Sequence, residues 1–400
     1  MARVLIPETL SGNVIAAIRS LTRQGDRCEA AWSEFIFKSR YVNEYHKITS
    51  SVVDDLEYVQ DILRLCKEKE YDILLPFGNT SYFAFSKHHE SISGNARFMV
   101  TDYETFKIAH DKYRTAKFCD LIGVKTPRIF TEYSHNDVVS LSKELRYPVV
   151  IKAKSGTGVH LGLRYANNGE ELLRYYDEIS SFRSDTGASN FEDPLIEEFI
   201  PGFIHDACAL SCNGKVVNVL TQRREMMYPI YGGVGAVNVT THNPEVSRLA
   251  RTLLEALNWH GPAQIEFKFD ERDRTYKLIE MNPKLWGTLD LAIKVGMDFP
   301  AMIRDTLLGK RVEINRPYPA GVRYKFLFPQ AILAYLQIVK EFGLSSAFDK
   351  ASYSETIYDL CFSDLRFELF RVAVALKTLL RKGLDSPNSN IPKEYINRFK

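Results

Sequence analysis

The 400-residue sequence has no long apolar run and no marked excess of charge of either sign. A membrane-spanning helix needs about 18 or more consecutive apolar residues, and no stretch approaches that length. The 52 basic and 50 acidic residues give a net charge of +2 at pH 7. This balance does not indicate a nucleic-acid-binding protein or a protein that acts at a membrane surface.

Cysteine is also scarce. Of the 6 cysteines, only Cys208 and Cys212 are close in the sequence, and no histidine or cysteine pair complements them at the spacing of a zinc site. The N-terminal stretch MARVLIPETLSG has an apolar run that ends at Pro7, which is typical of a first β-strand rather than of a signal peptide. We therefore expect reduced thiols and a cytoplasmic location.

The motif GxGxxG is absent, yet residues 1–110 alternate predicted strands and helices, from the strand RVLIP to the strand YDILLPFG. This order predicts a small, doubly wound parallel sheet. Because its first turn, ETLSGN, lacks the glycine motif, we expect a scaffold or a substrate wall rather than a nucleotide site. The helix DDLEYVQDILRLCKEKE is expected to bury one stripe: Leu56, Val59, Ile62, Leu63 and Cys66.

From residue 111 the pattern changes to strands and helices without a strict βαβ repeat. It includes two predicted β-hairpins, the first turning at Asn213-Gly214. This mixture predicts two α+β halves, residues 111–200 and 201–317. Residues 318–400 begin with a possible strand, GVRYKFLFP, and continue with helical patterns, so we expect a C-terminal, mainly helical extension.

The second hairpin, AQIEFKF-DERDRT-YKLIEMN, carries polar residues in an apolar setting. If Glu266 faces Glu280 in an antiparallel register, then Gln264 faces Asn282, and all four side chains lie on one face. The opposite, apolar face is then formed by Ile265, Phe267, Ile279 and Met281.

Two carboxylates directly opposite each other repel, so a positive group must offset them if both are ionised. Glu266, Glu280 and Asn282 supply hard oxygen ligands, which suit Mg²⁺ or Mn²⁺. A solvated polar face with unrelated charges is the alternative, since the register is assumed.

The strand PVVIKAK places Lys152 and Lys154 on one face, and the loop SGTGVHLG follows at once. Glycines at 156, 158 and 162 let the backbone approach an anion, although a plain hairpin connection would also suit them. The loop does not match GxxxxGK[ST]. Lysines beside such a loop, together with a distant carboxylate hairpin, favour a phosphate site.

The order Asp111-Lys112, PVVIKAKSGTGVHLG, LIEEFIPG, AQIEFKF and LIEMNPK resembles the ATP-grasp superfamily over roughly residues 1–310. The hairpin that ends in Glu-x-Asn-Pro-Lys is the most specific element of this resemblance. Similar members include carboxylate–amine ligases and the large subunit of carbamoyl-phosphate synthase. The resemblance implies the ATP-grasp fold, with ATP held between the two α+β halves.

The resemblance also implies roles for individual residues. Lys112 and Lys152 would bind the nucleotide phosphates, and Lys154 would also belong to the nucleotide site. Residues 155–162, among them Ser155, Gly156, Thr157 and Gly158, would form a flexible lid. The adenine hinge would comprise Glu198, Phe199 and Ile200, with Glu197 as the alternative if the register slips by one. Glu266, Glu280 and Asn282 would bind Mg²⁺ or Mn²⁺, and Lys284 would face phosphate or the acceptor.

In one place the sequence departs from the family. Members usually have an acidic residue shortly after the hinge glycine to bind the ribose hydroxyls, and here only Asp206 in GFIHDACAL can serve. For the substrate carboxylate, Arg223 or Arg224 is a candidate for bidentate binding, with Arg323 a further candidate. A solvated strand end explains the two adjacent arginines equally well.

The implied reaction joins a small-molecule carboxylate to an amine through an acyl phosphate, with release of ADP and phosphate. Positioning and charge neutralisation supply most of the catalysis, which fits the lack of a convincing Ser/His/Asp or Cys/His set. The alternatives are an ATP-grasp kinase, activation of bicarbonate, and a non-catalytic ATP-binding regulatory module. The C-terminal region is either substrate-specific or the surface of a homodimer.

Overall fold

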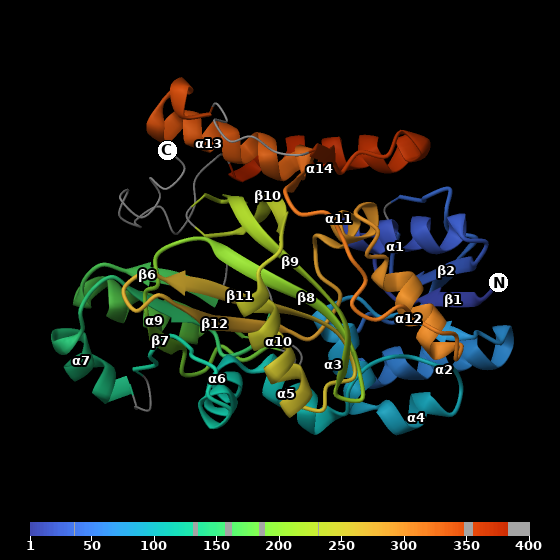
Figure 1. The fold of residues 1–400 in the computed structure, drawn as a ribbon, viewed down its shortest axis with the longest axis horizontal. Helices are drawn as coiled ribbons and strands as arrows, with labels where there is room; N and C mark the ends of the chain where they lie inside the picture. Colours follow the sequence, from blue (N-terminus) through green and yellow to red (C-terminus); the bar gives the residue numbers. More distant parts are fainter. Residues whose placement is uncertain are drawn as a thin grey trace.

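The computed structural model describes residues 1–35, 37–130, 135–156, 162–183, 189–230, 232–347 and 355–382. Its strands form a 4-stranded, a 3-stranded and a 7-stranded sheet. Figure 1 shows the N-terminal sheet beside the large sheet, with α13 and α14 lying across one end. No helix in the described part of the chain combines the length and the apolar character that crossing a bilayer requires.

The N-terminal sheet is parallel, with strand order β3-β2-β1-β4. Its strands are β1 (Arg3–Ile6), β2 (Arg27–Trp32), β3 (Glu44–Lys47) and β4 (Ile73–Leu74). The helices of this region are α1 (Gly12–Arg23), α2 (Asp55–Lys69), α3 (Asn79–Lys87), α4 (His89–Ser93) and α5 (Tyr103–His110). One apolar core contains α1 and another contains α2 and α3, so the prediction of a doubly wound parallel sheet is confirmed.

Helix α2 begins at an Asp54 cap whose side chain accepts hydrogen bonds from two backbone N–H groups of the first turn. The predicted buried stripe is partly wrong, because Leu56 is 52% exposed and Leu63 is half-buried. Tyr58 and Leu65 are buried instead. Helical periodicity located the helix correctly, but the angle of its inward face depends on contacts with the sheet.

The three-stranded sheet is antiparallel, in the order β6-β5-β7. Its strands are β5 (Val149–Lys152), β6 (Leu163–Ala166) and β7 (Leu195–Glu198). The helices beside it are α7 (His135–Glu144) and α9 (Gly169–Ser181), whereas α6 (Lys112–Leu121) packs in the core of the large sheet. Helices α7 and α9 share an apolar core with this sheet.

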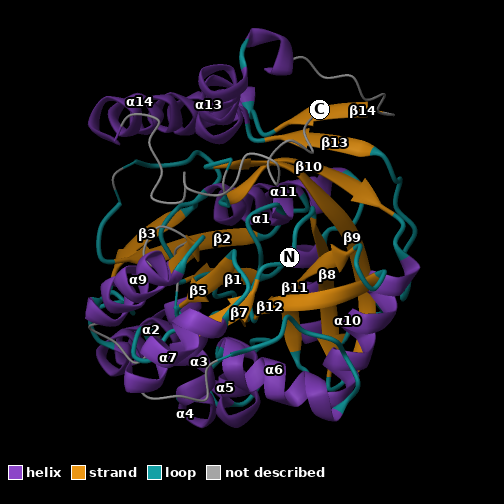
Figure 2. Cartoon of the chain, turned by 90° about the vertical axis from the view of Figure 1, so that its left-hand side faces the viewer, coloured by secondary structure: helices purple, strands orange, loops and turns teal. Residues whose placement is uncertain are grey.

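The seven-stranded sheet has the order β12-β11-β8-β9-β10-β13-β14. Its strands are β8 (Ile204–Cys212), β9 (Lys215–Tyr228), β10 (Val234–Thr241), β11 (Gly261–Asp270), β12 (Thr275–Asn282), β13 (Val322–Lys325) and β14 (Glu355–Tyr358). Asn213 and Gly214 join β8 to β9 with φ of 48° and 75°, as a tight hairpin turn requires. Figure 2 shows this sheet curving from β12 up to β14.

The remaining helices are α10 (Pro244–Ala256), α11 (Leu289–Lys294), α12 (Phe299–Leu307), α13 (Ile332–Phe342) and α14 (Leu365–Lys382). Shorter helical turns span Leu327–Ala331, Leu344–Ala347 and Phe362–Asp364. The mainly helical C-terminal region also extends the large sheet, because β13 pairs with β10 and β14 pairs with β13. All 6 cysteines are free thiols, 5 of them buried.

Candidate active site

A cavity of about 690 Å³ is lined by parts of all three regions of the chain: α1 and α3, strands β5 and β7, and strands of the large sheet. It brings together most of the residues that the sequence singles out. These are Lys112, Lys152, Gly156, Glu197, Glu198, Phe199, Ile200, Arg224, Glu266, Glu280, Asn282 and Lys284. Elements that are far apart in sequence therefore meet at one site.

Strands β11 and β12 form a hairpin, called the acidic hairpin below, and they pair in the expected register at the end away from their connecting turn. Glu266 pairs with Glu280, and Gln264 pairs with Asn282. A β-bulge then shifts the register, so that Phe267 pairs with Leu278. The expected apolar position of Ile279 is therefore wrong: this residue is half-buried and lines the cavity, and Leu278 takes its place in the core.

The opposed carboxylates are held by positive and hydrogen-bonding groups. Asn282 Nδ2 donates to Glu266 Oε1 over 3.0 Å and to Glu280 Oε1 over 3.2 Å. The Arg224 guanidinium forms an ion pair with Glu266, and Lys112 Nζ lies 3.5 Å from Glu280 Oε2. These contacts offset the repulsion that the paired strands would otherwise impose.

The two carboxyl groups titrate in opposite directions. Burial raises the pKa of Glu266, and the nearby Glu280 charge adds to this effect although Arg224 opposes it. Burial also disfavours the charged form of Glu280, but Lys112 and Lys152 outweigh it and lower the pKa. Glu280 therefore favours its charged form, whereas Glu266 favours its protonated form unless a further cation lies near the pair.

Lys152 is buried at the end of β5. Its Nζ lies 2.7 Å from Glu197 Oε2 and donates to the carbonyl of Ile279 over 2.9 Å. That carbonyl belongs to the bulged residue of β12, so the bulge supplies an acceptor for this lysine. The contact links the three-stranded sheet to the acidic hairpin.

Lys284 follows the hairpin by two residues and also lines the cavity. Within the described ranges no carboxylate forms an ion pair with its ammonium group. Burial lowers its pKa, and the charges of Glu8 and Glu280 oppose this shift. A desolvated ammonium group without an ion-pair partner is suited to bind an anionic ligand.

The segment after β7 forms one wall of the cavity through Glu197, Glu198, Phe199 and Ile200. The Glu198 carboxylate points to Lys277 and Arg272, at 2.8 and 2.9 Å, and is therefore held by the hairpin. Lys268 Nζ donates to the carbonyl of Ile200 over 2.8 Å. The segment can thus present backbone groups to a ligand while its acidic side chains serve other contacts.

The glycine loop is described only at its ends. Lys154 lies 3.9 Å from Asp193, and its carbonyl accepts a hydrogen bond from the backbone N–H of Lys112. Ser155 forms a backbone bridge with Asn190. Gly156 has φ of 114° and lines the cavity. The predicted lid residues Thr157 and Gly158 lie outside the described residues.

The sequence offered three arginines as candidates for binding the substrate carboxylate. Two of them, Arg223 and Arg323, do not line the cavity, so the expectation is corrected for these two. In the sheet register, Arg223 and Arg323 both pair with Val239, whereas Arg224 and Tyr324 both pair with Asn238. Because side chains alternate along a strand, these two rows lie on opposite faces. Arg224 and Tyr324 line the cavity.

The Glu225 carboxylate forms ion pairs with Arg223 at 2.5 Å and with Arg323 at 3.8 Å. These arginines thus belong to a polar cluster on the far face of the sheet. Arg224, on the cavity face, is itself held by Asp206 and Glu266.

Asp206 is also not placed to bind ribose. Its side chain is fully buried, accepting hydrogen bonds from Gln222 over 2.9 Å and from Arg224 over 2.8 Å. It lies next to Glu266 across the β8–β11 pair. Its role is therefore to hold Arg224 against the acidic hairpin.

Comparison with known proteins agrees with this geometry. The sequence model of a family described as "ATP-grasp in the biosynthetic pathway with Ter operon" matches residues 190–327, which include residues 197–200 and the acidic hairpin. The chain has the ATP-grasp fold. The resemblance to this superfamily and the expected fold class are thereby confirmed.

Relatives with assigned names have low sequence identity to this chain. The carbamoyl phosphate synthase large chain of Thermotoga neapolitana is 22% identical over 261 residues, a match that covers 63% of this chain but 23% of that protein. The D-aspartate ligase of Enterococcus faecium is 23% identical over 293 residues and is matched over 68% of both chains. The chain therefore spans about a quarter of the first relative and about two thirds of the second.

A solved structure shows the same fold. The biotin carboxylase domain of 2-oxoglutarate carboxylase from Hydrogenobacter thermophilus, in complex with MgADP, ADP and bicarbonate, superposes with a TM-score of 0.63. The sequence identity is 19%, and the alignment covers 80% of this chain and 73% of that chain.

The sequence did not indicate several residues that line the cavity. Lys268 lies on the same strand face as Gln264 and Glu266, and its ammonium group lies 5.2 Å from the centre of the Phe199 ring. Period-2 alternation along β11 could have identified it. Asn79 and Trp286 also line the cavity, but no local pattern marks them.

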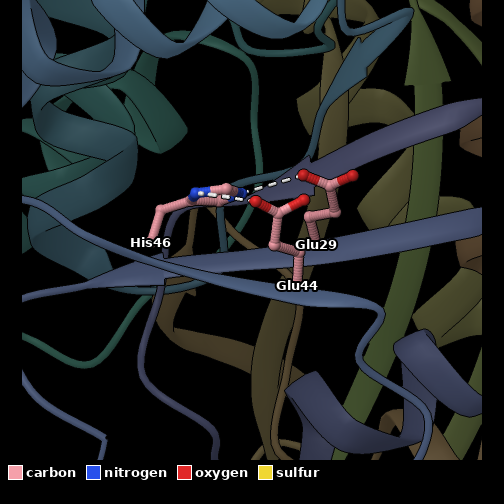
Figure 3. Close-up of side chains that lie close together, drawn as sticks. All are labelled: Glu29, Glu44 and His46. Atoms are coloured by element: carbon pink, nitrogen blue, oxygen red, sulfur yellow. Dashed lines mark hydrogen bonds and ion pairs between the residues drawn. The ribbon is translucent and has the colours of Figure 1, made fainter.

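A separate acidic cluster lies in the N-terminal sheet, where Glu29, Glu44 and His46 come together (Figure 3). Their spacing would suit a metal ion, but cations already surround them. Glu29 contacts four side chains: Arg3, Arg27, His46 and Tyr71. Lys69 lies 2.8 Å from Glu44. In this structure the cluster forms an ion-pair network.

The network predicts a pH-dependent contribution to stability. Burial raises the pKa of Glu29, but hydrogen bonds from Tyr71 and Arg27 outweigh it and lower the pKa to about 2 from the ordinary 4.5. The stabilisation is therefore present above pH 4.5 and is lost as the pH falls toward 2. Glu29→Gln is expected to lower the free energy of unfolding by about 3 kcal/mol near neutral pH.

Urea unfolding of wild type and variant near neutral pH and at about pH 3 measures this difference, which should shrink in acid. Glu44→Gln is the matched control, with a smaller loss because Glu44 is 37% exposed. A loss for Glu29→Gln that is the same at both pH values would contradict the assignment.

Proposed function

We propose that this chain is an ATP-dependent ligase that activates a carboxylate as an acyl phosphate and couples it to an amine. The observation that carries the proposal is the cavity in which Glu266, Glu280 and Asn282 face Lys112 and Lys152. Paired oxygen ligands beside lysines suit a metal–triphosphate group. The similarity to a D-aspartate ligase supports C–N bond formation.

The nucleotide would lie between the three-stranded and the seven-stranded sheets. Lys112 and Lys152 would neutralise phosphate oxygens, since both ammonium groups already face the acidic hairpin. The adenine would lie against the hinge segment, residues 197–200, and Lys268 would support that segment through the Ile200 carbonyl. Lys154, Ser155 and Gly156 would lie at the root of the closing loop.

The residues present fit a divalent cation. Burial raises the pKa of Glu266 and the Glu280 charge adds to this effect, so a cation bound beside both groups would favour their ionised forms. The Asn282 amide lies between them, with Nδ2 donating to both carboxylates, and its oxygen would be a further donor of the kind typical of Mg²⁺ or Mn²⁺ sites. When bound, the ion would neutralise phosphate charge.

In the first step a carboxylate oxygen of the substrate attacks the γ-phosphorus, and the bond to the β-phosphate oxygen breaks to release ADP. In the second step an amine attacks the acyl carbon, phosphate leaves, and the amine loses a proton. Lys284 would reduce the repulsion between the two anions in the first step. No protein nucleophile is required.

The test is a screen for ADP and phosphate release with Mg²⁺ across pairs of small acids and amines. Turnover that requires both partners supports the ligase. ADP formation with a hydroxyl acceptor alone would contradict the ligase proposal and indicate a kinase. ADP formation with bicarbonate alone would indicate a bicarbonate-activating enzyme. ATP binding without turnover on any pair would favour a regulatory module.

The cytoplasmic location, the domain boundaries and a homodimer stay predictions. Gel filtration with light scattering measures the last of these directly. The exposed apolar side chains of α14, among them Leu369 and Leu380, make this helix the first place to mutate if a dimer is found.

A further inference from the structure

The proposed nucleotide and metal site accounts for only part of the cavity. Another part of its lining comes from the N-terminal domain and from the segment after the acidic hairpin. It includes Gly12, Asn13, Asn79, Trp286 and Gly287. None of these residues has a role in the proposed ATP site, and Lys284 belongs to the same lining.

This wall lies at a topological switch point. Strand β1 has β2 on one side and β4 on the other, and all three are parallel. The helices that follow β1 and β4 are α1 and α3, and they pack in separate cores. In such a sheet the connections leave β1 and β4 in opposite directions and open a crevice at the carboxyl ends of the strands.

The two helices that start at this crevice differ in how their N-termini are satisfied. At α3, the Glu8 carboxylate accepts hydrogen bonds from the Gly78 N–H over 2.7 Å and from the Ser81 hydroxyl. At α1, Ser11 makes no side-chain cap and the first turn has no acidic residue. Among the described residues only the Val14 N–H has a side-chain acceptor there, Asn13 Oδ1 at 3.1 Å, so the first N–H groups of the helix stay open. The N-terminus of α1 therefore keeps its positive end available for an anion.

Two buried polar atoms on the same cavity wall have no hydrogen-bond partner among the described residues. Asn79 Oδ1 and Trp286 Nε1 make no hydrogen bond to any described residue, and their side chains belong to residues that are only 8% and 1% exposed. A buried acceptor and a buried donor left unsatisfied are each costly. Both would gain a partner from a ligand that carries a donor and an acceptor.

We propose that this wall is the subsite for the acid that is activated, and that the acid carries a hydrogen-bond donor beside its carboxylate, as α-amino acids do. The carboxylate is bound by the N-terminus of α1, Trp286 Nε1 and Lys284, and Asn79 Oδ1 accepts from the neighbouring donor. The inference rests on the proposed ligase function, because Lys284 joins this subsite to the acidic hairpin.

The choice of an acid over an amine follows from charge. The first turn of α1 and the ammonium group of Lys284 are both positive, and no ion pair within the described ranges neutralises Lys284. Gly12 leaves open space, because a Cβ added there meets no atom within 4 Å. A small anion therefore has both room and attraction at this end of the cavity.

One pair of variants tests the charge. Gly12→Asp and Gly12→Asn have nearly the same shape, but only the first places a negative charge at the first turn of α1. Aspartate there is expected to raise the KM for the acid by about tenfold or more, without lowering Tm and with the KM for ATP unchanged. Asparagine adds the same bulk without the charge and is expected to raise the acid KM by clearly less than aspartate does; equal effects of the two variants would overturn the role of charge at this end of the cavity.

A second pair tests the unpaired donor. Trp286→Phe removes the N–H and should weaken binding of the acid by about tenfold. Trp259→Phe is the matched control, since Trp259 is also 1% exposed but donates to the Pro262 carbonyl in a different core. Equal effects of the two variants on the acid KM would overturn the role of Trp286.

Calorimetry measures binding of the acid directly, so its result does not depend on whether the protein has ligase activity. Binding of the standard α-amino acids, and of lactate and malate as α-hydroxy acids, is measured with Mg²⁺ and a non-hydrolysable ATP analogue. Binding by wild type that is lost in Gly12→Asp supports the subsite even if no pair yields ADP. No binding of any of these acids, or binding that Gly12→Asp leaves unchanged, overturns it.

Discussion

Glu280→Gln is expected to abolish Mg-ATP turnover, with a loss of at least about a hundredfold in kcat, while the protein stays folded. Glu280 faces Glu266 across the hairpin and is the carboxyl group whose pKa is lowered by Lys112 and Lys152. It is therefore the member of the pair that favours the charged form, and the proposed charged ligand of the metal. Removing its charge relieves repulsion in the sheet, so the fold should not suffer.

Phosphate release measures the loss, and circular dichroism with a thermal melt checks the fold. Glu255→Gln is the matched control, because Glu255 is an exposed residue of α10 away from the cavity lining. That variant should turn over like wild type. Wild-type phosphate release by Glu280→Gln would refute the assignment of the metal-binding hairpin.

Lys152→Met is expected to raise the KM for ATP and to destabilise the protein by about 3–5 kcal/mol. The lysine is 7% exposed and lies 2.7 Å from Glu197, which is 5% exposed. Burial already raises the pKa of Glu197, and Lys152 is the charge that opposes this shift most. Without the lysine, a buried carboxyl group is left without its counter-charge.

The double variant Lys152→Met with Glu197→Gln separates binding from folding. Removing both charges should recover most of the stability, as measured by urea unfolding, because no unpaired charge is left. The KM for ATP should stay high, since the phosphate-binding cation is still missing. If the double variant recovered a wild-type KM, Lys152 would be a purely structural residue.

Strand periodicity predicted the acidic face of the hairpin. Residues two apart on a strand share a face, so placing Glu266 opposite Glu280 also placed Gln264 opposite Asn282. The same reasoning was wrong at Ile279, because a bulge shifts the register immediately beyond Glu266. Bulges depend on how the strand meets its neighbours, here on Lys152 binding the bulged carbonyl.

The sequence alone does not show on which face of β9 each of its two adjacent arginines lies. Arg223 and Arg224 are adjacent, so they must point to opposite faces of β9, but the sequence does not say which face borders the cavity. The packing of β9 between β8 and β10 decides this. It also brings Asp206 against Arg224, so the Asp206 side chain is buried and does not line the cavity.

By itself the sequence determined the local elements and their faces: the parallel N-terminal unit, the turn at Asn213-Gly214 and the oxygen-rich face of the last hairpin. These depend on contacts between near neighbours and on the alternation of side chains. Only the tertiary structure decided which cations meet those carboxylates. Lys112 and Arg224 come from distant strands and helices, and their positions depend on how three sheets pack around one cavity.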